Sequence, residues 1–216
     1  MPVWAISRLR MVTDGSGVTT LVTAQGCPLR CRYCLNPVSW NGEATPAFLT
    51  PEELYEQVRI DDLYFQATGG GVTFGGGEPL LYPDFIADFR ALCPKEWKLR
   101  AETSLHVPRE NLEKVMDAVD EFFVDIKDMN PAIYESYTGK TNRLIYDNLT
   151  YLLGSVGPRA HRGARAADPR FQHGNGCGVL SHRTARNGCR ALRPVPVQAN
   201  RSVKIQIPGN ELIPGT

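Results

Sequence analysis

The 216-residue sequence has no apolar run that approaches the roughly 18 residues needed for a membrane-spanning helix. Its first residues, MPVWAISRLRMVTDG, also lack the apolar segment and small-residue cleavage site of a secretory signal peptide. Both absences predict a cytoplasmic protein without a membrane span. In that setting the six cysteines are better explained by metal binding or catalysis than by a disulfide framework.

No repeat of fixed period and no strong compositional bias distinguishes the chain. Hydrophobic residues make up 42% of the sequence and charged residues 22%, which is ordinary for a globular protein. A length of 216 residues accommodates one domain with a substantial core, or two small ones. Composition therefore identifies a globular chain but no particular activity.

Residues 1–154 alternate between patterns typical of strands and of helices. Val18–Thr23 is β-branched and follows the turn signal Asp14–Gly17, which predicts a hairpin or a strand entering a sheet. Further strands are predicted at 72–74, 98–103 and 122–127, with helices at 51–68, 83–92, 108–119 and 142–153. Strands separated by helices of this length predict a parallel sheet wrapped by helices. The predicted fold class is therefore α/β.

The helix at 51–68 has clear signals at both ends. Thr50 can cap it, Pro51 suits its first position, Glu53 completes a capping box, and a glycine run from Gly69 ends it. The apolar positions predicted to face inward in this helix are Leu54, Val58, Leu63 and Phe65. In the helix at 142–153 they are Leu144, Ile145, Leu149 and Leu152.

Beyond about residue 155 this alternation ends. Residues 1–154 carry 14 Lys and Arg against 21 Asp and Glu, a net charge of −7, whereas residues 155–216 carry 10 against 2, or +8. Residues 157–201 contain nine Arg, no Lys and much Gly, Ala and Pro, with no sustained period. Such a segment is explained by a disordered basic tail, by a basic nucleic-acid arm, or by GC-rich codons translated in a wrong reading frame. We prefer the last interpretation, and translating the DNA in its other two reading frames would test it. The chain is accordingly divided into a core at 1–154 and an aberrant tail at 155–216.

Three cysteines, Cys27, Cys31 and Cys34, lie within eight residues in the spacing CxxxCxxC. A loop of this length can fold around one compact centre, and thiolates are soft ligands suited to iron–sulfur clusters or zinc. Electron-transfer clusters of the 4Fe-4S type ordinarily use four cysteines, so three leave one iron open for a small molecule to chelate. That arrangement is needed when a cluster must pass an electron directly into a bound substrate. The motif therefore predicts a 4Fe-4S cluster on these three cysteines.

Structural zinc is the main alternative for the triad. It would need a fourth ligand from Cys93, Cys177, Cys189 or a histidine, and none of these has the paired spacing of a zinc module. Chance clustering of inert thiols is the other alternative.

A glycine-rich turn, Gly75–Pro79, follows the predicted strand at 72–74. Glycines at that point let a ligand approach the main chain closely, and Glu78 adds a carboxylate. A phosphate-binding loop is disfavoured because the run lacks a Gly-Lys-Ser/Thr ending and a helix that starts directly on it. A bare turn is the remaining alternative.

Polar residues end the next two predicted strands: Glu102 and Thr103 close the first, Asp125 and Lys127 the second. Because such strand ends converge on one face of a parallel α/β barrel, these residues are predicted to line one mouth beside the cysteine loop. Asp125 and Lys127 are two positions apart and so can point the same way from a strand. A salt bridge at the rim is the alternative for this pair.

At these motifs the sequence resembles the radical SAM superfamily, and more closely the activating enzymes of glycyl radical enzymes, of the pyruvate formate-lyase activating enzyme type. The resemblance covers about residues 10–153 and rests on DGSGVTTLVTAQGCPLRCRYCLNP, GGGVTFGGGEPLL, ETS at 102–104 and VDIKDMNPAIYESYTGK. About forty residues without cysteine separate Cys34 from Gly75, which implies the short form that lacks a ferredoxin-like insertion. The implied fold is a partial (β/α)6-type radical SAM barrel, incomplete at its C-terminal end.

The resemblance also implies a site for S-adenosylmethionine. Gly76, Gly77 and Glu78 would bind its methionine amino group. Lys127 would contact its ribose or carboxylate, and Asp125 would orient that contact.

Two further positions follow from the same resemblance. Some activating enzymes hold a monovalent cation with an aspartate and a threonine at the positions of Glu102 and Thr103, and this chain has Glu in place of Asp. Tyr33 would pack against the adenine, or alternatively belong to the core. No catalytic side chain beyond the cluster ligands is implied.

In the implied reaction, a reduced cluster chelated by the amino and carboxylate groups of S-adenosylmethionine passes one electron to the sulfonium. The products are methionine and a 5′-deoxyadenosyl radical, which takes a hydrogen from the α-carbon of a glycine in a partner glycyl radical enzyme. A flavodoxin or ferredoxin would donate the electron. Two alternatives are a radical SAM enzyme acting on a small molecule or peptide, and a cluster-binding but inactive product.

Overall fold

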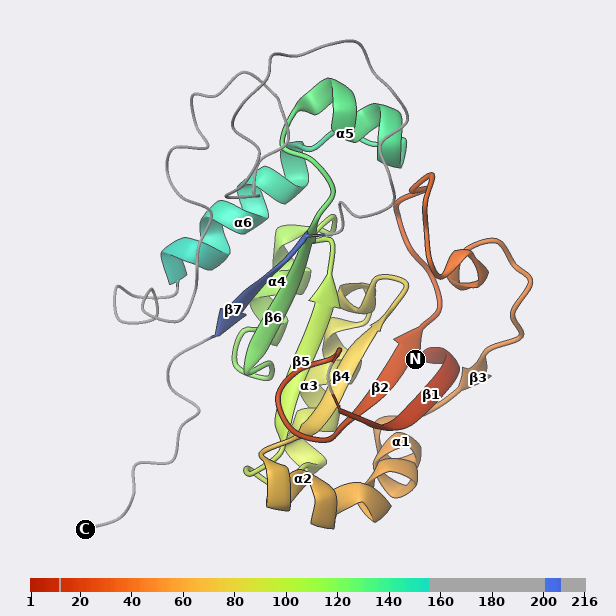
Figure 1. Cartoon of the computed structure of the whole chain (residues 1–216), viewed down its shortest axis with the longest axis vertical. Helices are drawn as coiled ribbons and strands as arrows, with labels where there is room; N and C mark the ends of the chain where they lie inside the picture. The colour runs from red at the N-terminus through yellow and green to blue at the C-terminus, as the bar shows by residue number, and fades with distance from the viewer. Residues whose placement is uncertain (12, 156–200, 207–216) are drawn as a thin grey trace.

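The computed structural model describes residues 1–11, 13–155 and 201–206 (Figure 1). Its centre is a seven-stranded sheet of order β3-β1-β2-β4-β5-β6-β7. The strands are β1 (Pro2–Arg10), β2 (Thr19–Ala24), β3 (Ala47–Phe48), β4 (Gly71–Gly76), β5 (Lys98–Thr103), β6 (Glu121–Ile126) and β7 (Arg201–Gln206). The α-helices are α1 (Pro51–Val58), α2 (Asp62–Thr68), α3 (Pro83–Leu92), α4 (Arg109–Val115), α5 (Pro131–Thr138) and α6 (Arg143–Ser155). Three short 3-10 helices are η1 (Pro37–Ser39), η2 (Arg59–Asp61) and η3 (Pro79–Leu81).

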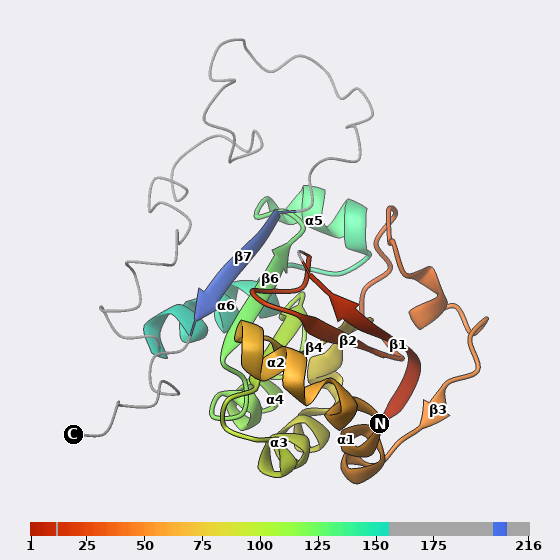
Figure 2. The ribbon, with the colours of Figure 1, turned by 60° about the horizontal axis from the view of Figure 1, so that its bottom comes forward.

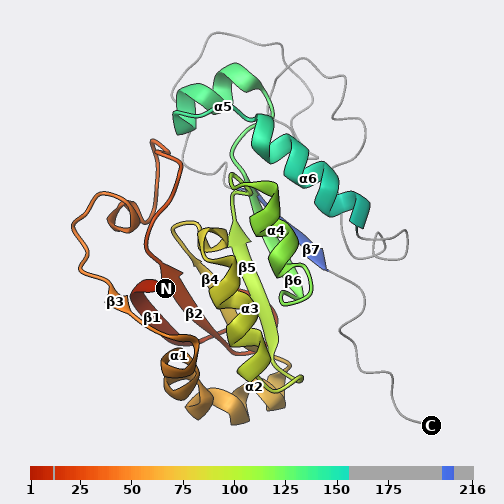
Figure 3. The ribbon, with the colours of Figure 1, turned by 180° about the vertical axis from the view of Figure 1, so that it is seen from behind.

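Four neighbouring strands, β2, β4, β5 and β6, run parallel to one another. β1 forms the predicted antiparallel hairpin with β2 and pairs with β3 on its other side. Helices α3 and α4 lie over one face of β4 and β5, as the view from behind shows (Figure 3). The α/β prediction is confirmed, with an incomplete barrel of parallel strands. Among the described residues, no helix has the length and apolar character of a membrane span.

The predicted capping box forms at the start of α1. Thr50 Oγ1 accepts a hydrogen bond from Glu53 N–H at 3.2 Å, and the Glu53 side chain accepts one from Thr50 N–H at 2.8 Å. The prediction of one continuous helix over 51–68 is wrong, because α1 ends at Val58 and η2 separates it from α2. The inward position predicted for Leu63 is also wrong: nine residues after Leu54, it lies about half a turn round an α-helix from the other three. Leu63 is 75% exposed, whereas those three residues are buried.

Helix α6 follows the prediction for the final helix with one exception. Ile145, Leu149 and Leu152 are buried, but Leu144 is 41% exposed. Adjacent helical residues point about 100° apart around the axis, so Leu144 cannot share the buried direction of Ile145.

Helix α5 is absent from the sequence-based prediction although its end signals are present. The Asn130 side chain caps it by accepting from the N–H groups of Ala132 and Ile133, and Pro131 takes the first helical position. At the other end Gly139 adopts a left-handed conformation with φ of 73°. The helix connects β6 to α6 and lies beside the cysteine loop.

One strand comes from the region predicted to be an aberrant tail. β7 pairs antiparallel with β6, from Arg201 opposite Ile126 to Gln206 opposite Glu121, and lies at the edge of the sheet (Figure 2). No strand is predicted there. The disordered-tail, nucleic-acid-arm and reading-frame interpretations cover residues 155–216, of which segments 156–200 and 207–216 lie outside the described residues.

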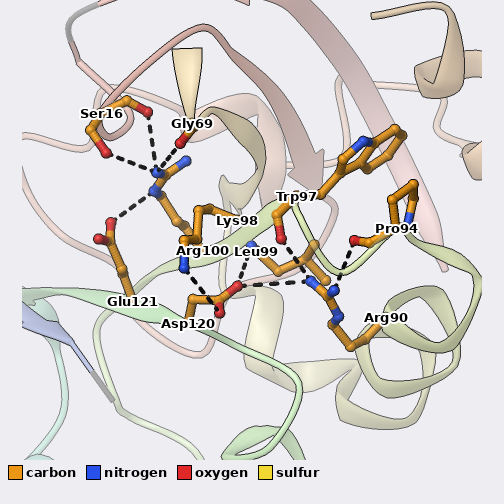
Figure 4. A network of polar contacts seen from close by, with 10 residues as sticks. All are labelled: Ser16, Gly69, Arg90, Pro94, Trp97, Lys98, Leu99, Arg100, Asp120 and Glu121. Carbon is orange, nitrogen blue, oxygen red and sulfur yellow. Dashed lines mark hydrogen bonds and ion pairs between the residues drawn. The ribbon is translucent and has the colours of Figure 1, made fainter. Parts of the chain in front are cut away.

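A buried charge network joins the amino-terminal halves of β5 and β6 (Figure 4). Arg100 is fully buried, and its Nε donates to Glu121 Oε2 at 2.8 Å. Its Nη2 donates to the carbonyl and hydroxyl oxygens of Ser16, both at 3.1 Å. Nearby, Asp120 lies 3.8 Å from Arg90 Nη1. Buried charges persist only where partners satisfy them, so this network fixes β5 against β6 and the loop before β2.

Candidate functional site

A cavity of about 260 Å³ opens at the carboxyl ends of the parallel strands. Its walls come from the loop after β2, the turn after β4, and the ends of β5 and β6. Ten of the eleven residues predicted for the site line it: Cys27, Cys31, Tyr33, Cys34, Gly76, Gly77, Glu102, Thr103, Asp125 and Lys127. The fold therefore brings three separate sequence motifs and the cysteine triad to one place.

The cysteine loop, residues 27–34, is held in shape by the end of α5. Arg30 N–H donates to Thr138 O at 2.9 Å, and Arg32 N–H donates to Tyr137 O at 3.0 Å. The last carbonyls of a helix have no partner within it, so the cysteine loop satisfies these two. The main chain that carries the cysteines is thus anchored without the help of a ligand.

The thiols of the triad are half-buried. Burial raises the pKa of Cys27 to about 12 and also raises the pKa of Cys31. Cys34 Sγ accepts a hydrogen bond from the Trp40 indole N–H at 3.4 Å. Thiols with raised pKa values remain protonated at neutral pH until a metal displaces the proton.

The residues present fit a cluster better than a zinc ion. Within the described ranges, no three His, Cys, Asp or Glu side chains, the cysteine triad included, lie together as the ligands of a single metal ion. Cys93, proposed as a fourth zinc ligand, is absent from the cavity lining, and its Sγ donates to Phe89 O at 3.2 Å. Cys177 and Cys189 lie outside the described residues. The cavity is lined by three thiols and extends beyond them. This arrangement suits a cluster in which one iron has no protein ligand and can bind a small molecule.

Gly77 brings the turn after β4 against the cysteine loop. A Cβ at this position would lie 2.1 Å from the carbonyl oxygen of Gly26, so a larger residue does not fit. Gly77 N–H donates to Ala24 O at 3.1 Å, and Glu78 N–H donates to Gly26 O at 2.8 Å. The glycine run therefore has a packing role, and both Gly76 and Gly77 also line the cavity.

Glu78 is the one predicted site residue that does not line the cavity. Its side chain is fully buried, and its carboxylate accepts from Thr103 Oγ1 at 2.7 Å, Ser104 N–H at 2.9 Å and Ser104 Oγ at 2.6 Å. Leu80 N–H donates to it as well, at 3.2 Å. Both carboxylate oxygens are therefore occupied by the chain itself. Glu78 fastens the turn after β4 to the end of β5.

Glu78→Gln is expected to lower the free energy of unfolding by about 1–3 kcal/mol. The amide places an N–H₂ donor where the carboxylate accepted, so buried donors of Thr103 or Ser104 lose their acceptor. Urea denaturation measures the change, with the exposed Glu113→Gln on α4 as the matched control. Equal stabilities of the two variants would contradict this role.

Glu102 reaches the cavity wall near two other carboxylates. Burial raises its pKa to about 7, Asp14 and Asp125 add to the rise, and Arg10 opposes it. Asp14 is itself 3% exposed and forms an ion pair with Arg10. Glu102 is therefore a carboxyl group that exchanges its proton close to neutral pH.

Stability of the metal-free protein is expected to fall by about 2 kcal/mol between pH 5 and pH 8 because of Glu102. Its pKa of about 7 in the folded protein exceeds the ordinary value of 4.5, so the folded state binds more protons across this window. Stability then decreases as the pH rises through it. Chemical denaturation at several pH values should show this slope in the wild type and in Glu113→Gln, and a flatter slope in Glu102→Gln. An unchanged slope in Glu102→Gln would refute the assignment.

Asp125 and Lys127 form an ion pair at the cavity wall, so the salt bridge considered as the alternative is present. Burial lowers the pKa of Lys127, but Asp125, Cys31 and Tyr137 together raise it by more, and the net shift is upward. Asp125 Oδ1 is buried and has no hydrogen-bond partner among the described residues. The pair thus contributes to the cavity wall a cation and a carboxylate with one unpaired oxygen.

Tyr33 is 47% exposed at the cavity rim, with its ring centroid 5.8 Å from that of Tyr137, and so is not a core residue. Six lining residues are missing from the predicted set: Leu29, Leu35, Asn36, Ser39, Ser104 and Phe123. Ser104 belongs to the ETS motif, which could have indicated it. Asn36 Nδ2 donates to Gly76 O at 3.3 Å, a tertiary contact with no local sequence signal.

Three cysteines on the loop after the first parallel strand, in an incomplete α/β barrel, are typical of one large class of enzymes. A comparison with protein families agrees: the radical SAM superfamily matches residues 21–157, and the chain belongs to it. Members of this superfamily use a 4Fe-4S cluster and S-adenosylmethionine.

Several similar proteins of known function are activating enzymes. The chain is 40% identical over 132 residues to the pyruvate formate-lyase-activating enzyme of Clostridium pasteurianum, covering 61% of this chain and 55% of that protein. It is 31% identical over 142 residues to the pyruvate formate-lyase 1-activating enzyme of Escherichia coli K12, covering 64% and 57%. It is 28% identical over 202 residues to the (2S)-3-sulfopropanediol dehydratase activating enzyme of Klebsiella oxytoca, covering 65% and 64%. The chain thus spans less than two thirds of the length of each.

Proposed function

We propose that Cys27, Cys31 and Cys34 hold a 4Fe-4S cluster and that S-adenosylmethionine binds beside it in the same cavity. The observation that carries this proposal is the shared cavity, which three thiols and the ends of β4, β5 and β6 line together. When bound, the cluster supplies the electron that splits S-adenosylmethionine into methionine and a 5′-deoxyadenosyl radical. Residues 1–154 form the radical SAM core in this proposal.

The side chains of the cavity bind and orient the ligand. The ammonium of Lys127 faces its carboxylate or ribose, and Asp125 holds that ammonium in place by their ion pair. Gly76 and Gly77 leave the main chain open to the methionine end. Tyr33, exposed at the rim, offers an aromatic surface to the adenine.

The reaction that we propose is activation of a glycyl radical enzyme by hydrogen abstraction from one of its glycines. The names of the relatives support this substrate class, since all three are activating enzymes. We also propose that an external flavodoxin or ferredoxin donates the single electron to the cluster. The protein is proposed to be cytoplasmic. Glu102 and Thr103 remain the proposed place for a monovalent cation.

Anaerobic reconstitution of the full chain with iron and sulfide tests the proposal. After reduction in the presence of S-adenosylmethionine, 5′-deoxyadenosine and methionine should form in equal amounts, and omission of the reductant should prevent this. A cluster that forms without either product would support a cluster-binding but inactive protein instead. Addition of a glycyl radical enzyme encoded by a neighbouring gene should then yield its radical signal in electron paramagnetic resonance.

A further inference from the structure

A group of exposed basic residues covers the outside of the cysteine loop. We call Arg30, Arg32 and Lys140 the basic patch; all three are exposed. Thr138 joins two of them, because its carbonyl accepts from Arg30 N–H at 2.9 Å and its Oγ1 accepts from Lys140 N–H at 3.2 Å. Arg32 N–H is bound to the neighbouring carbonyl, that of Tyr137. Hydrogen bonds to the end of α5 therefore keep the main chains of the three residues close together.

The charge of Arg30 is held close to the first cysteine. Its Nη1 donates to Cys27 O at 2.7 Å and to Leu29 O at 2.8 Å. Its guanidinium also lies 4.8 Å from the centroid of the Trp40 ring, within the range of a cation–π contact. This positive charge is thus fixed over the loop instead of moving freely in solvent.

The basic patch stands out against an acidic background. Residues 15–42, which include the cysteine loop, contain no Asp or Glu, although residues 1–154 carry a net charge of −7. Exposed acidic residues are most numerous on helices α1, α3 and α4, where they are Glu52, Glu53, Glu56, Asp84, Asp88, Glu110 and Glu113, while α5 carries Glu135 and α6 carries Asp147. Helices α1, α3 and α4 lie on the helical side of the sheet (Figure 3). An acidic protein is therefore repelled by that side and attracted to the cysteine loop.

We propose that the basic patch is the docking surface for an acidic protein that donates single electrons to the cluster. This inference rests on the proposed function, since it requires a cluster in the cysteine loop. The donor loses one electron, the cluster gains it, and no bond forms or breaks. Electron transfer needs the two centres close together, and the cysteine loop is the segment that lies between the cavity and the patch. Electron-transfer complexes bury little area, so charge complementarity dominates their encounter.

A binding measurement tests the docking surface directly. The reconstituted full chain is titrated against an immobilised acidic flavodoxin at low and at physiological ionic strength. The double variant Arg32→Glu/Lys140→Glu should bind about tenfold more weakly at low ionic strength and lose most of its salt dependence. The control Arg59→Glu/Lys95→Glu makes the same change in net charge at exposed positions elsewhere and should bind like the wild type. Equal binding by the two double variants would overturn the proposal.

Comparing two reductants tests the docking surface separately from the proposed function. With a photochemical small-molecule reductant, Arg32→Glu/Lys140→Glu should keep its cluster absorbance and its yield of 5′-deoxyadenosine. With reduced flavodoxin, its rate should fall about tenfold relative to the control variant. A loss with both reductants would show damage to the site and overturn the docking role. If the wild type yields no 5′-deoxyadenosine with the small reductant, the proposed function fails, and the binding comparison alone decides the docking surface.

Discussion

Cys31→Ser is expected to remove nearly all cluster iron after anaerobic reconstitution and to abolish formation of 5′-deoxyadenosine. A serine hydroxyl is a hard and weakly acidic ligand, whereas iron–sulfur clusters select soft thiolates. Among the described residues three thiols line the cavity, so the loss of one leaves two irons without a protein ligand from this part of the chain. Iron and sulfide analysis together with the visible absorbance of the cluster measures the effect.

Cys93→Ser is the matched control for that experiment. This cysteine is also half-buried, but its Sγ donates to Phe89 O and does not line the cavity. The control should therefore keep the iron content and the absorbance of the wild type. Full cluster content in Cys31→Ser, or its loss in Cys93→Ser, would refute the assignment of the triad.

Arg100→Met is expected to cost about 3–5 kcal/mol of unfolding free energy. Arg100 is fully buried, and the substitution keeps much of its volume but removes the positive charge beside Glu121. The carboxylate then remains buried without its arginine, and the oxygens of Ser16 lose their donor. Urea denaturation of the metal-free protein measures the change in midpoint at constant slope.

Two further variants show whether charge causes that loss. Lys114→Met breaks the exposed pair with Asp84 and should cost less than about 1 kcal/mol. The double variant Arg100→Met/Glu121→Leu removes both buried charges and should recover much of the stability that Arg100→Met loses. Equal losses for Arg100→Met and Lys114→Met would mean that the buried pair contributes nothing of its own.

The order of strands and helices could be predicted because it depends on local chemistry. The β-branched segment Val18–Thr23 and the Thr50 capping box act within a few residues, and they form β2 at Thr19–Ala24 and the start of α1. The break between α1 and α2 could not be predicted, because it coincides with tertiary contacts. Asp61 in η2 is buried and accepts from Arg8 and from Thr20, two residues far away in the sequence.

The residues that form the candidate site could be predicted from the sequence better than the orientations of their side chains. Residues at the ends of parallel strands share one edge of the sheet, which is enough to bring Glu102 and Lys127 to one cavity. Whether a carboxylate in a turn faces the cavity or the interior depends on its neighbours in space. Glu78 turns inward because Thr103 and Ser104, from the next strand, supply the donors that it needs.

The hydrogen bonds between α5 and the cysteine loop have a consequence for how the protein acquires and keeps its iron. They join main-chain atoms on both sides, so neither the metal nor any side chain is needed to form them. The thiols therefore lie on a loop that is already folded. Binding of the cluster does not have to offset the loss of conformational entropy of this loop. We therefore expect that a cluster lost to oxygen can be rebuilt on the same folded loop when iron and sulfide are supplied.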